Sequence, residues 1–165
     1  MNSGDSPAQP VFIEAPSHPK LQQLLAYWTA KRGDRAAPAR AEIRPEEIKS
    51  LLPDVMIWNV EKVGGPFTIR LVGENIVRFV GRNNTGASAT AGMPEEAAAV
   101  MTAVLTQVAQ TLTPIFRAGK TFWHREKSYR DFEVCYLPLS TDGISANMIL
   151  GGLKFLDDEP ARALR

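Results

Sequence analysis

Cysteine and histidine are scarce in this sequence: its 165 residues include one cysteine and two histidines. A lone cysteine excludes an internal disulfide and a cysteine-based zinc site, and two histidines exclude a histidine-rich metal site. Charge of one sign is also lacking, because 19 basic and 18 acidic residues leave a net charge of +1. We therefore predict no metal site and no nucleic-acid partner.

Long apolar runs are missing as well. No run approaches the ~18 residues that a membrane-spanning helix needs, and residues 1–8 lack the basic and apolar regions of a secretory signal. We expect a cytoplasmic protein without membrane insertion. Its length predicts one domain, residues 17–156, with a flexible N-terminal arm (1–16) in which residues 11–13 could dock and a C-terminal tail (157–165).

Compact catalytic motifs do not occur: there is no P-loop, dinucleotide-binding glycine pattern, HExxH or GxSxG. His124 lies at the end of a predicted strand, and we interpret it as an exposed hairpin residue. Cys135 lies in the middle of a predicted strand, which is typical of a buried structural cysteine. No catalytic residue is predicted.

Helical spacing is clear in two segments. After Pro19, apolar residues recur at i, i+3, i+4 and i+7, which predicts an amphipathic helix over 19–31; they are Leu21, Leu24, Leu25 and Trp28. A second apolar stripe predicts a long helix from Pro94 to Leu112. Shorter helices are expected after Pro45 and over residues 76–80.

Strand-like runs cover residues 55–60, 67–72, 115–123, 128–139 and 144–155. Short turns between the first two and the last two predict antiparallel hairpins. The order of elements predicts an α+β domain with a five-stranded, mostly antiparallel sheet and helices on one face. The strand over 55–60 is apolar on both sides, so its second side needs cover from the 19–31 helix or from a partner subunit. Gly151 and Gly152 suggest a bulge or the close approach of another element.

Several short phrases, in this order and spacing, resemble a PAS domain, and in particular a subfamily of stand-alone bacterial PAS proteins. The resemblance covers about residues 20–156. The phrases are Arg32-Gly33-Asp34, Pro38-Ala39-Arg40, Ile43-Arg44-Pro45, Leu51-Leu52-Pro53, Arg70-Leu71-Val72-Gly73, Gly81-Arg82, Thr85-Gly86, Tyr136-Leu137-Pro138-Leu139-Ser140 and Asp142-Gly143.

The resemblance implies a sensory or interaction module that holds a small organic ligand between sheet and helices, or signals by protein contact. Many PAS domains dimerise through a helix before the first strand, which implies a homodimer through the surface that carries Leu21, Leu24, Leu25 and Trp28. No output domain is fused to the chain, so a signalling partner in trans is expected. Haem and flavin are not expected, because neither histidine lies on a pocket helix and Cys135 is outside the helical phrase of photochemical PAS domains.

Candidate ligand-binding residues are Trp58, Arg70, Phe79, Trp123 and Tyr136. The aromatic residues could line a pocket or form a filled core. Arg40 and Arg70 could anchor loops through carboxylates or clamp an anionic ligand. Two other functions stay open. One is a small α+β cone enzyme of the NTF2 kind, which would need Asp131, Glu133 or His124 inside its pocket; the other is a docking module with a filled core.

Overall fold

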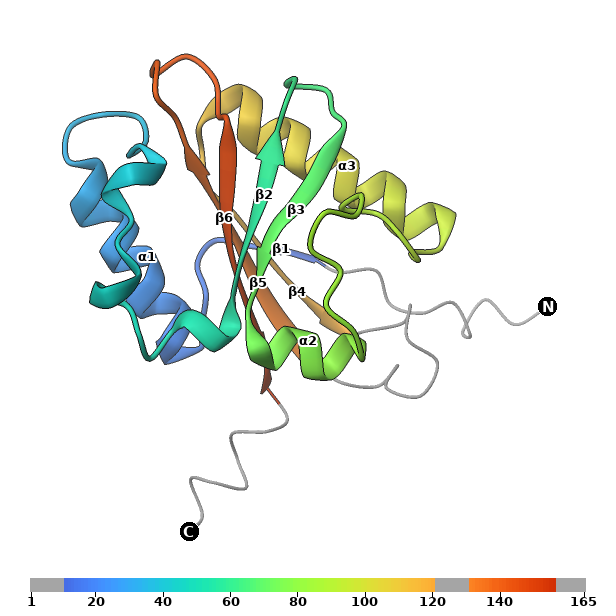
Figure 1. The fold of residues 1–165 in the computed structure, drawn as a ribbon. Coiled ribbons are helices and arrows are strands. Elements are labelled where there is room, and N and C mark those ends of the chain that lie inside the picture. The colour runs from blue at the N-terminus through green and yellow to red at the C-terminus, as the bar shows by residue number, and fades with distance from the viewer. Residues whose placement is uncertain (1–10, 121–130, 157–165) are drawn as a thin grey trace, which may run out of the picture.

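The computed structural model describes residues 11–120 and 131–156. Within them the chain forms one antiparallel sheet of six strands in the order β1-β4-β5-β6-β2-β3. The strands are β1 (Val11–Ile13), β2 (Val55–Val60), β3 (Phe67–Val72), β4 (Ile115–Lys120), β5 (Asp131–Leu139) and β6 (Met148–Phe155). The helices are α1 (Pro19–Arg32), α2 (Glu74–Val80) and α3 (Glu95–Thr111). Figure 1 shows how they are arranged.

The predicted α+β architecture is confirmed, with one additional strand. Val11–Ile13, which we expected to lie in the N-terminal arm, form β1 at the edge of the sheet and pair with β4. The short helix expected after Pro45 is instead a series of single 3₁₀ turns: Arg40–Glu42, Pro45–Glu47 and Leu52–Asp54. Pro45 and Pro53 each open a turn and leave too little chain between them for a longer helix.

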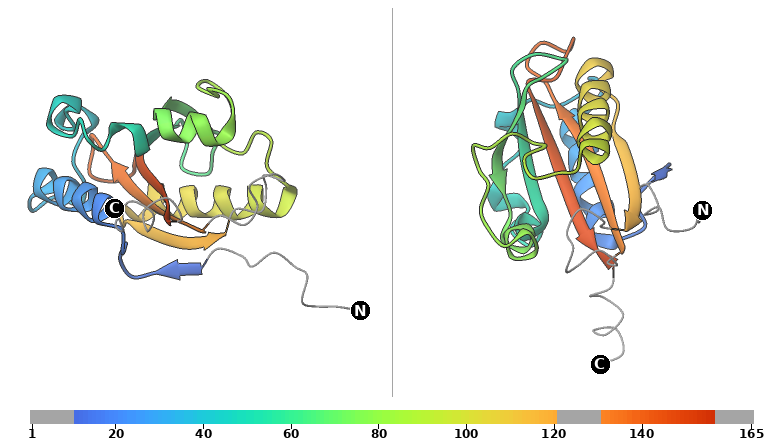
Figure 2. Two further views of the ribbon diagram at one scale, coloured as in Figure 1. Left: turned by 90° about the horizontal axis from the view of Figure 1, so that it is seen from below. Right: turned by 90° about the vertical axis from the view of Figure 1, so that its right-hand side faces the viewer.

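The sheet is covered on both faces. Helix α1 packs on one face, while α2 and α3 lie over the other (Figures 1 and 2). Leu21, Leu24 and Trp28 of α1 are each 1% exposed, and the indole Nε1 of Trp28 donates a hydrogen bond of 2.8 Å to the carbonyl oxygen of Pro138. Helix α1 packs on β5 and β6, and its Leu21 and Leu24 lie beside Val55 of β2, so α1 provides part of the second cover that the two-sided apolar pattern of β2 needs.

This packing corrects the partner-surface hypothesis. Leu21, Leu24 and Trp28 are buried against their own sheet and have no area left for another chain, and Leu25 is half-buried. The sequence left two possible covers for the sheet open, the 19–31 helix of the same chain and a partner subunit. The structure has the first.

Gly151 and Gly152 are the points of close approach that the sequence predicts. A Cβ atom on Gly152 would lie 2.8 Å from Leu21 and from Leu24, whereas a Cβ on Gly151 would lie 2.5 Å from the Trp58 ring. Because successive residues of a strand face opposite sides, the first glycine admits Trp58 on one face of β6 and the second admits α1 on the other.

A β-bulge in β3 changes which side chains share a face. Ile69 pairs with Trp58 and Leu71 pairs with Ile57, so Arg70 has no partner residue on β2. The extra residue turns Leu71 away from the side that Ile69 faces, although simple alternation predicts one face for both. Arg70 and Leu71 are both exposed.

Candidate functional site

A cavity of about 310 Å³ lies between the sheet and the helices α2 and α3. Most of its walls are apolar, and side chains from five strands and two helices contribute; examples are Met56, Ile69, Ile76, Val100, Val134 and Leu153. The segment between α2 and α3 closes one side, with Arg82 and Asn84 among its lining residues. A concave apolar site of this size with a few polar groups is typical of small-molecule sites, which span about 300–1,000 Å³.

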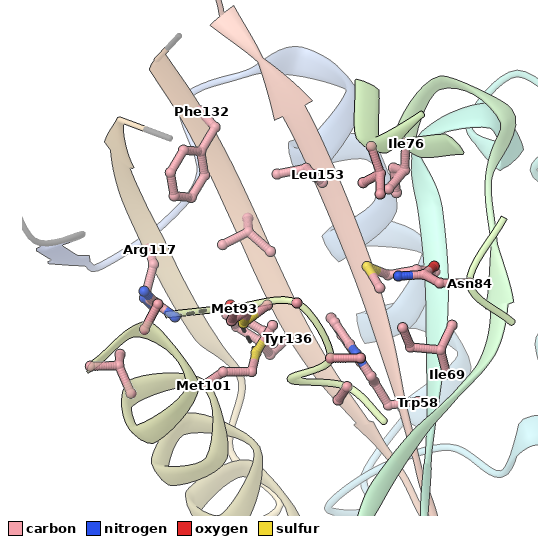
Figure 3. Close-up of a pocket in the computed structure, with 18 of the residues that line it drawn as sticks. Trp58, Ile69, Ile76, Asn84, Met93, Met101, Arg117, Phe132, Tyr136 and Leu153 are labelled. Carbon is pink, nitrogen blue, oxygen red and sulfur yellow. Dashed lines mark hydrogen bonds between the residues drawn. The ribbon is translucent and has the colours of Figure 1, made fainter. Parts of the chain in front are cut away.

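Three polar side chains face the cavity from the sheet (Figure 3). Arg117 of β4 is 6% exposed, Tyr136 of β5 is 2% exposed and Trp58 of β2 is 1% exposed. Nη1 of Arg117 donates a hydrogen bond of 3.1 Å to the Tyr136 hydroxyl, which in turn points its proton toward Sδ of Met101 at 3.9 Å. The rings of Trp58 and Tyr136 stack with centroids 5.5 Å apart.

The local sequence explains this arrangement. Alternation along β5 points Phe132, Val134 and Tyr136 into the cavity, and Glu133 and Cys135 toward α1. Gly151 of β6 lacks a side chain, so the Trp58 ring can lie across β6 and reach Tyr136. Burial raises the pKa of the Tyr136 phenol, against the opposing effect of Arg117, so Tyr136 is a neutral hydroxyl at physiological pH.

The structure brings together two of the five predicted ligand residues. Trp58 and Tyr136 line the cavity. Phe79 does not: it is buried against Phe155, with ring centroids 4.0 Å apart. Arg70 does not either, because it lies on the bulge and is exposed. Trp123 lies outside the described residues.

Arg40, the other candidate anion clamp, anchors a loop. Its Nη1 donates a hydrogen bond of 2.9 Å to the carbonyl oxygen of Ile43. The buried arginine that lines the cavity is instead Arg117, which was not among the candidates predicted from the sequence. The available signal was its position between apolar residues in a predicted strand, the same feature that drew attention to Arg70.

Two of the three acid–base candidates of the enzyme alternative, Asp131 and Glu133, do not line the cavity. Glu133 lies on the α1 face, where its carboxylate accepts hydrogen bonds from the backbone N–H groups of Ser17 and His18 and from the Ser17 hydroxyl. Asp131 pairs with Lys120 at 3.1 Å on the surface. His124 lies outside the described residues. Among the described residues that line the cavity there is no carboxylate and no histidine.

Cys135 is the lone thiol of the chain, and it faces α1 rather than the cavity. It is fully buried, with its Sγ near Gly152, and burial raises the pKa of its thiol to about 12. A photochemical flavin site needs a thiol that reaches the cavity, so the residues present do not fit such a site.

The native protein is therefore expected to resist thiol reagents at pH 7–8. Burial and the raised pKa both withhold the thiolate that reacts. Treatment with a chromogenic disulfide reagent should label one thiol per chain in denaturant and almost none without it. Rapid labelling of the folded protein would show that Cys135 is accessible.

Comparison with known proteins agrees with this architecture. The sequence matches the family described as PAS domain over residues 16–154. The chain belongs to the PAS family. PAS domains are in general sensory and signalling modules without catalytic activity of their own. No curated protein matches the chain.

The chain is also similar to several solved structures, including the following three. The PAS domain of the fruit-fly ELK potassium channel is 11% identical and covers 67% of this chain and 92% of its own, with a TM-score of 0.46. The light-state LOV structure of the blue-light photoreceptor Aureochrome1 is 9% identical and covers 72% and 93%, with a TM-score of 0.45. An RNA-binding light-oxygen-voltage receptor is 9% identical and covers 96% and 42%, with a TM-score of 0.50. At these identities the likeness concerns the fold alone.

Two kinds of feature are absent from the described part of the PAS domain. None of its helices there is both long and apolar enough to cross a bilayer. In the same residues, no three side chains of histidine, cysteine, aspartate or glutamate gather where they could hold a metal ion.

Proposed function

We propose that this PAS domain is a sensory module that binds a small organic molecule in the cavity between its sheet and the helices α2 and α3. The observation that carries the proposal is the cavity of about 310 Å³, which is apolar over most of its wall and has buried polar groups on the sheet side. A core evolved only for stability is close-packed, with few voids larger than a water molecule. A space this large favours a binding site over a filled docking module.

Strand β5 supports a route by which binding could alter the surface. Its residues Val134 and Tyr136 line the cavity. The residue before Val134 is Glu133, which faces the other side of the sheet and holds the N-terminal end of α1 through Ser17 and His18. A ligand that binds two packings of the domain with different affinity shifts the balance between them. In this proposal the output is a change in how α1 and the sheet contact a signalling partner or a second copy, in the cytoplasm.

Native mass spectrometry of the freshly purified full chain tests the proposal. The wild type is expected to carry an additional mass that is lost on denaturation. Val134→Phe should not carry it, because the new ring occupies the cavity. Thr102→Phe is the matched control, since it adds the same ring at an exposed position of α3, and it should behave as the wild type.

Two results together would show that the cavity is not a binding site. The wild type would carry no additional mass, and no compound of a fragment library would bind to it better than to Val134→Phe.

A further inference from the structure

The polar groups on the sheet side of the cavity are hydrogen-bond donors without enough acceptors. Nε of Arg117 and Nε1 of Trp58 are buried and have no hydrogen-bond partner. Figure 3 places these two side chains on opposite sides of Tyr136. Buried donors are almost always satisfied in folded proteins, because leaving a buried polar group without a hydrogen bond is unfavourable. Both side chains line the cavity, although the two nitrogens are themselves covered, so a small side-chain rotation would let a ligand supply the missing acceptor atoms.

Arg117 also lacks a compensating charge. No ion pair joins it to a carboxylate in the described part of the chain; its hydrogen bond goes to the neutral Tyr136 hydroxyl. The other charged residue that lines the cavity, Arg82, is also a cation and is exposed at the outer wall. A buried guanidinium without an anion is unfavourable, and Arg presents two parallel N–H groups that match a carboxylate.

We infer that the cavity binds an amphipathic monocarboxylic acid, with its carboxylate at Arg117 beside the Tyr136 hydroxyl and its apolar body between α3 and the sheet. Among the described residues that line the cavity, Arg117 is the one buried cation, which matches a single negative charge, and the apolar walls match a hydrocarbon or aromatic body rather than a sugar. An acceptor oxygen farther along the body would satisfy Nε1 of Trp58. This inference names the ligand class for the proposed function and rests on it.

Matched acids and alcohols test the head group. Octanoate and 1-octanol have the same chain length and differ in charge, as do 4-phenylbutyrate and 4-phenyl-1-butanol. Isothermal titration of the full chain with each compound should give affinities about 10- to 100-fold higher for the acids, the range expected for hydrogen bonds to a charged group. This comparison within the wild type needs no variant.

Arg117→Met removes the cation and keeps an apolar side chain of similar length. We expect it to lose the 10- to 100-fold preference while 1-octanol binds within about 2-fold of the wild type. Arg70→Met is the control, because Arg70 is an exposed arginine outside the cavity. Ligand-free Arg117→Met should melt no lower than the wild type, since an unpaired buried charge has been removed.

The outcomes separate the two proposals. Equal affinity for acid and alcohol, or a preference that survives Arg117→Met, overturns the head-group assignment and leaves small-molecule binding in place. Tighter binding of octyl phosphate than of octanoate overturns the carboxylate in favour of a phosphate. Binding of no compound, with the same result for Val134→Phe, contradicts the proposed function itself.

Discussion

Replacement of Trp28 by alanine is expected to lower the free energy of unfolding by about 3–5 kcal/mol, the usual range for a fully buried tryptophan. The Trp28 side chain is 1% exposed on the α1 face of the sheet, and its Nε1–H bond to Pro138 would also be lost. A loss of this size is a large part of the total stability of a domain, which is about 5–15 kcal/mol. Urea unfolding followed by circular dichroism measures it.

Two control variants test the packing of Trp28, and the concentration dependence of unfolding tests self-association. Trp28→Phe keeps most of the ring and removes the hydrogen bond, so it should cost about 1–2 kcal/mol. Leu25→Ala truncates a half-buried residue of the same helix and should cost less than Trp28→Ala. If Trp28 instead lay in a dimer seam, the midpoint of wild-type unfolding would rise with protein concentration, and this dependence would disappear in Trp28→Ala.

Replacement of Glu133 by alanine is expected to lower the free energy of unfolding by about 2–4 kcal/mol, because the backbone N–H groups of Ser17 and of the buried His18 would lose their acceptor. The carboxylate is 3.0 Å from the Ser17 nitrogen and 2.9 Å from the His18 nitrogen, at the N-terminal end of α1. A negative charge at this end of a helix is also favourable for the helix dipole. Thermal and urea unfolding measure the change.

Glu133→Gln is the informative companion variant. It keeps one acceptor oxygen and the size of the side chain, so it should lose less stability than Glu133→Ala. Because the carboxylate lies on the α1 face, neither variant should change the preference for octanoate over 1-octanol. A change in that preference with no loss of stability would place Glu133 in the ligand site, in conflict with this account.

The sheet was largely predictable because strand signals in this sequence are local. The strands over 55–60 and 67–72 have the predicted bounds, since the Gly64-Gly65 turn separates two clear β-type runs. The close approaches at Gly151 and Gly152 were also predicted from sequence. The bulge at Arg70 was not, because an extra residue in one strand leaves the apolar pattern unchanged and appears only in the pairing.

The cavity was predictable only in part. Trp58 and Tyr136 were assigned to a ligand site, but the same aromatic residues would also suit a filled core. Arg117 was missed because its role depends on β4 pairing with β5, which sets its side chain beside Tyr136, 19 positions farther along the chain. The role of α1 stayed open for the same reason, since an amphipathic pattern shows an apolar face but not what covers it.

The central claim, that the cavity is the ligand site, is tested most directly by methyl NMR of the full chain with ¹³C-labelled methionine. The chain has five methionines. Met56, Met93 and Met101 line the cavity, whereas Met148 does not. As octanoate or 4-phenylbutyrate is added, the account predicts that the three cavity resonances shift together and saturate while Met148 stays in place. Cavity resonances that do not move with either acid or with the matched alcohols would contradict it.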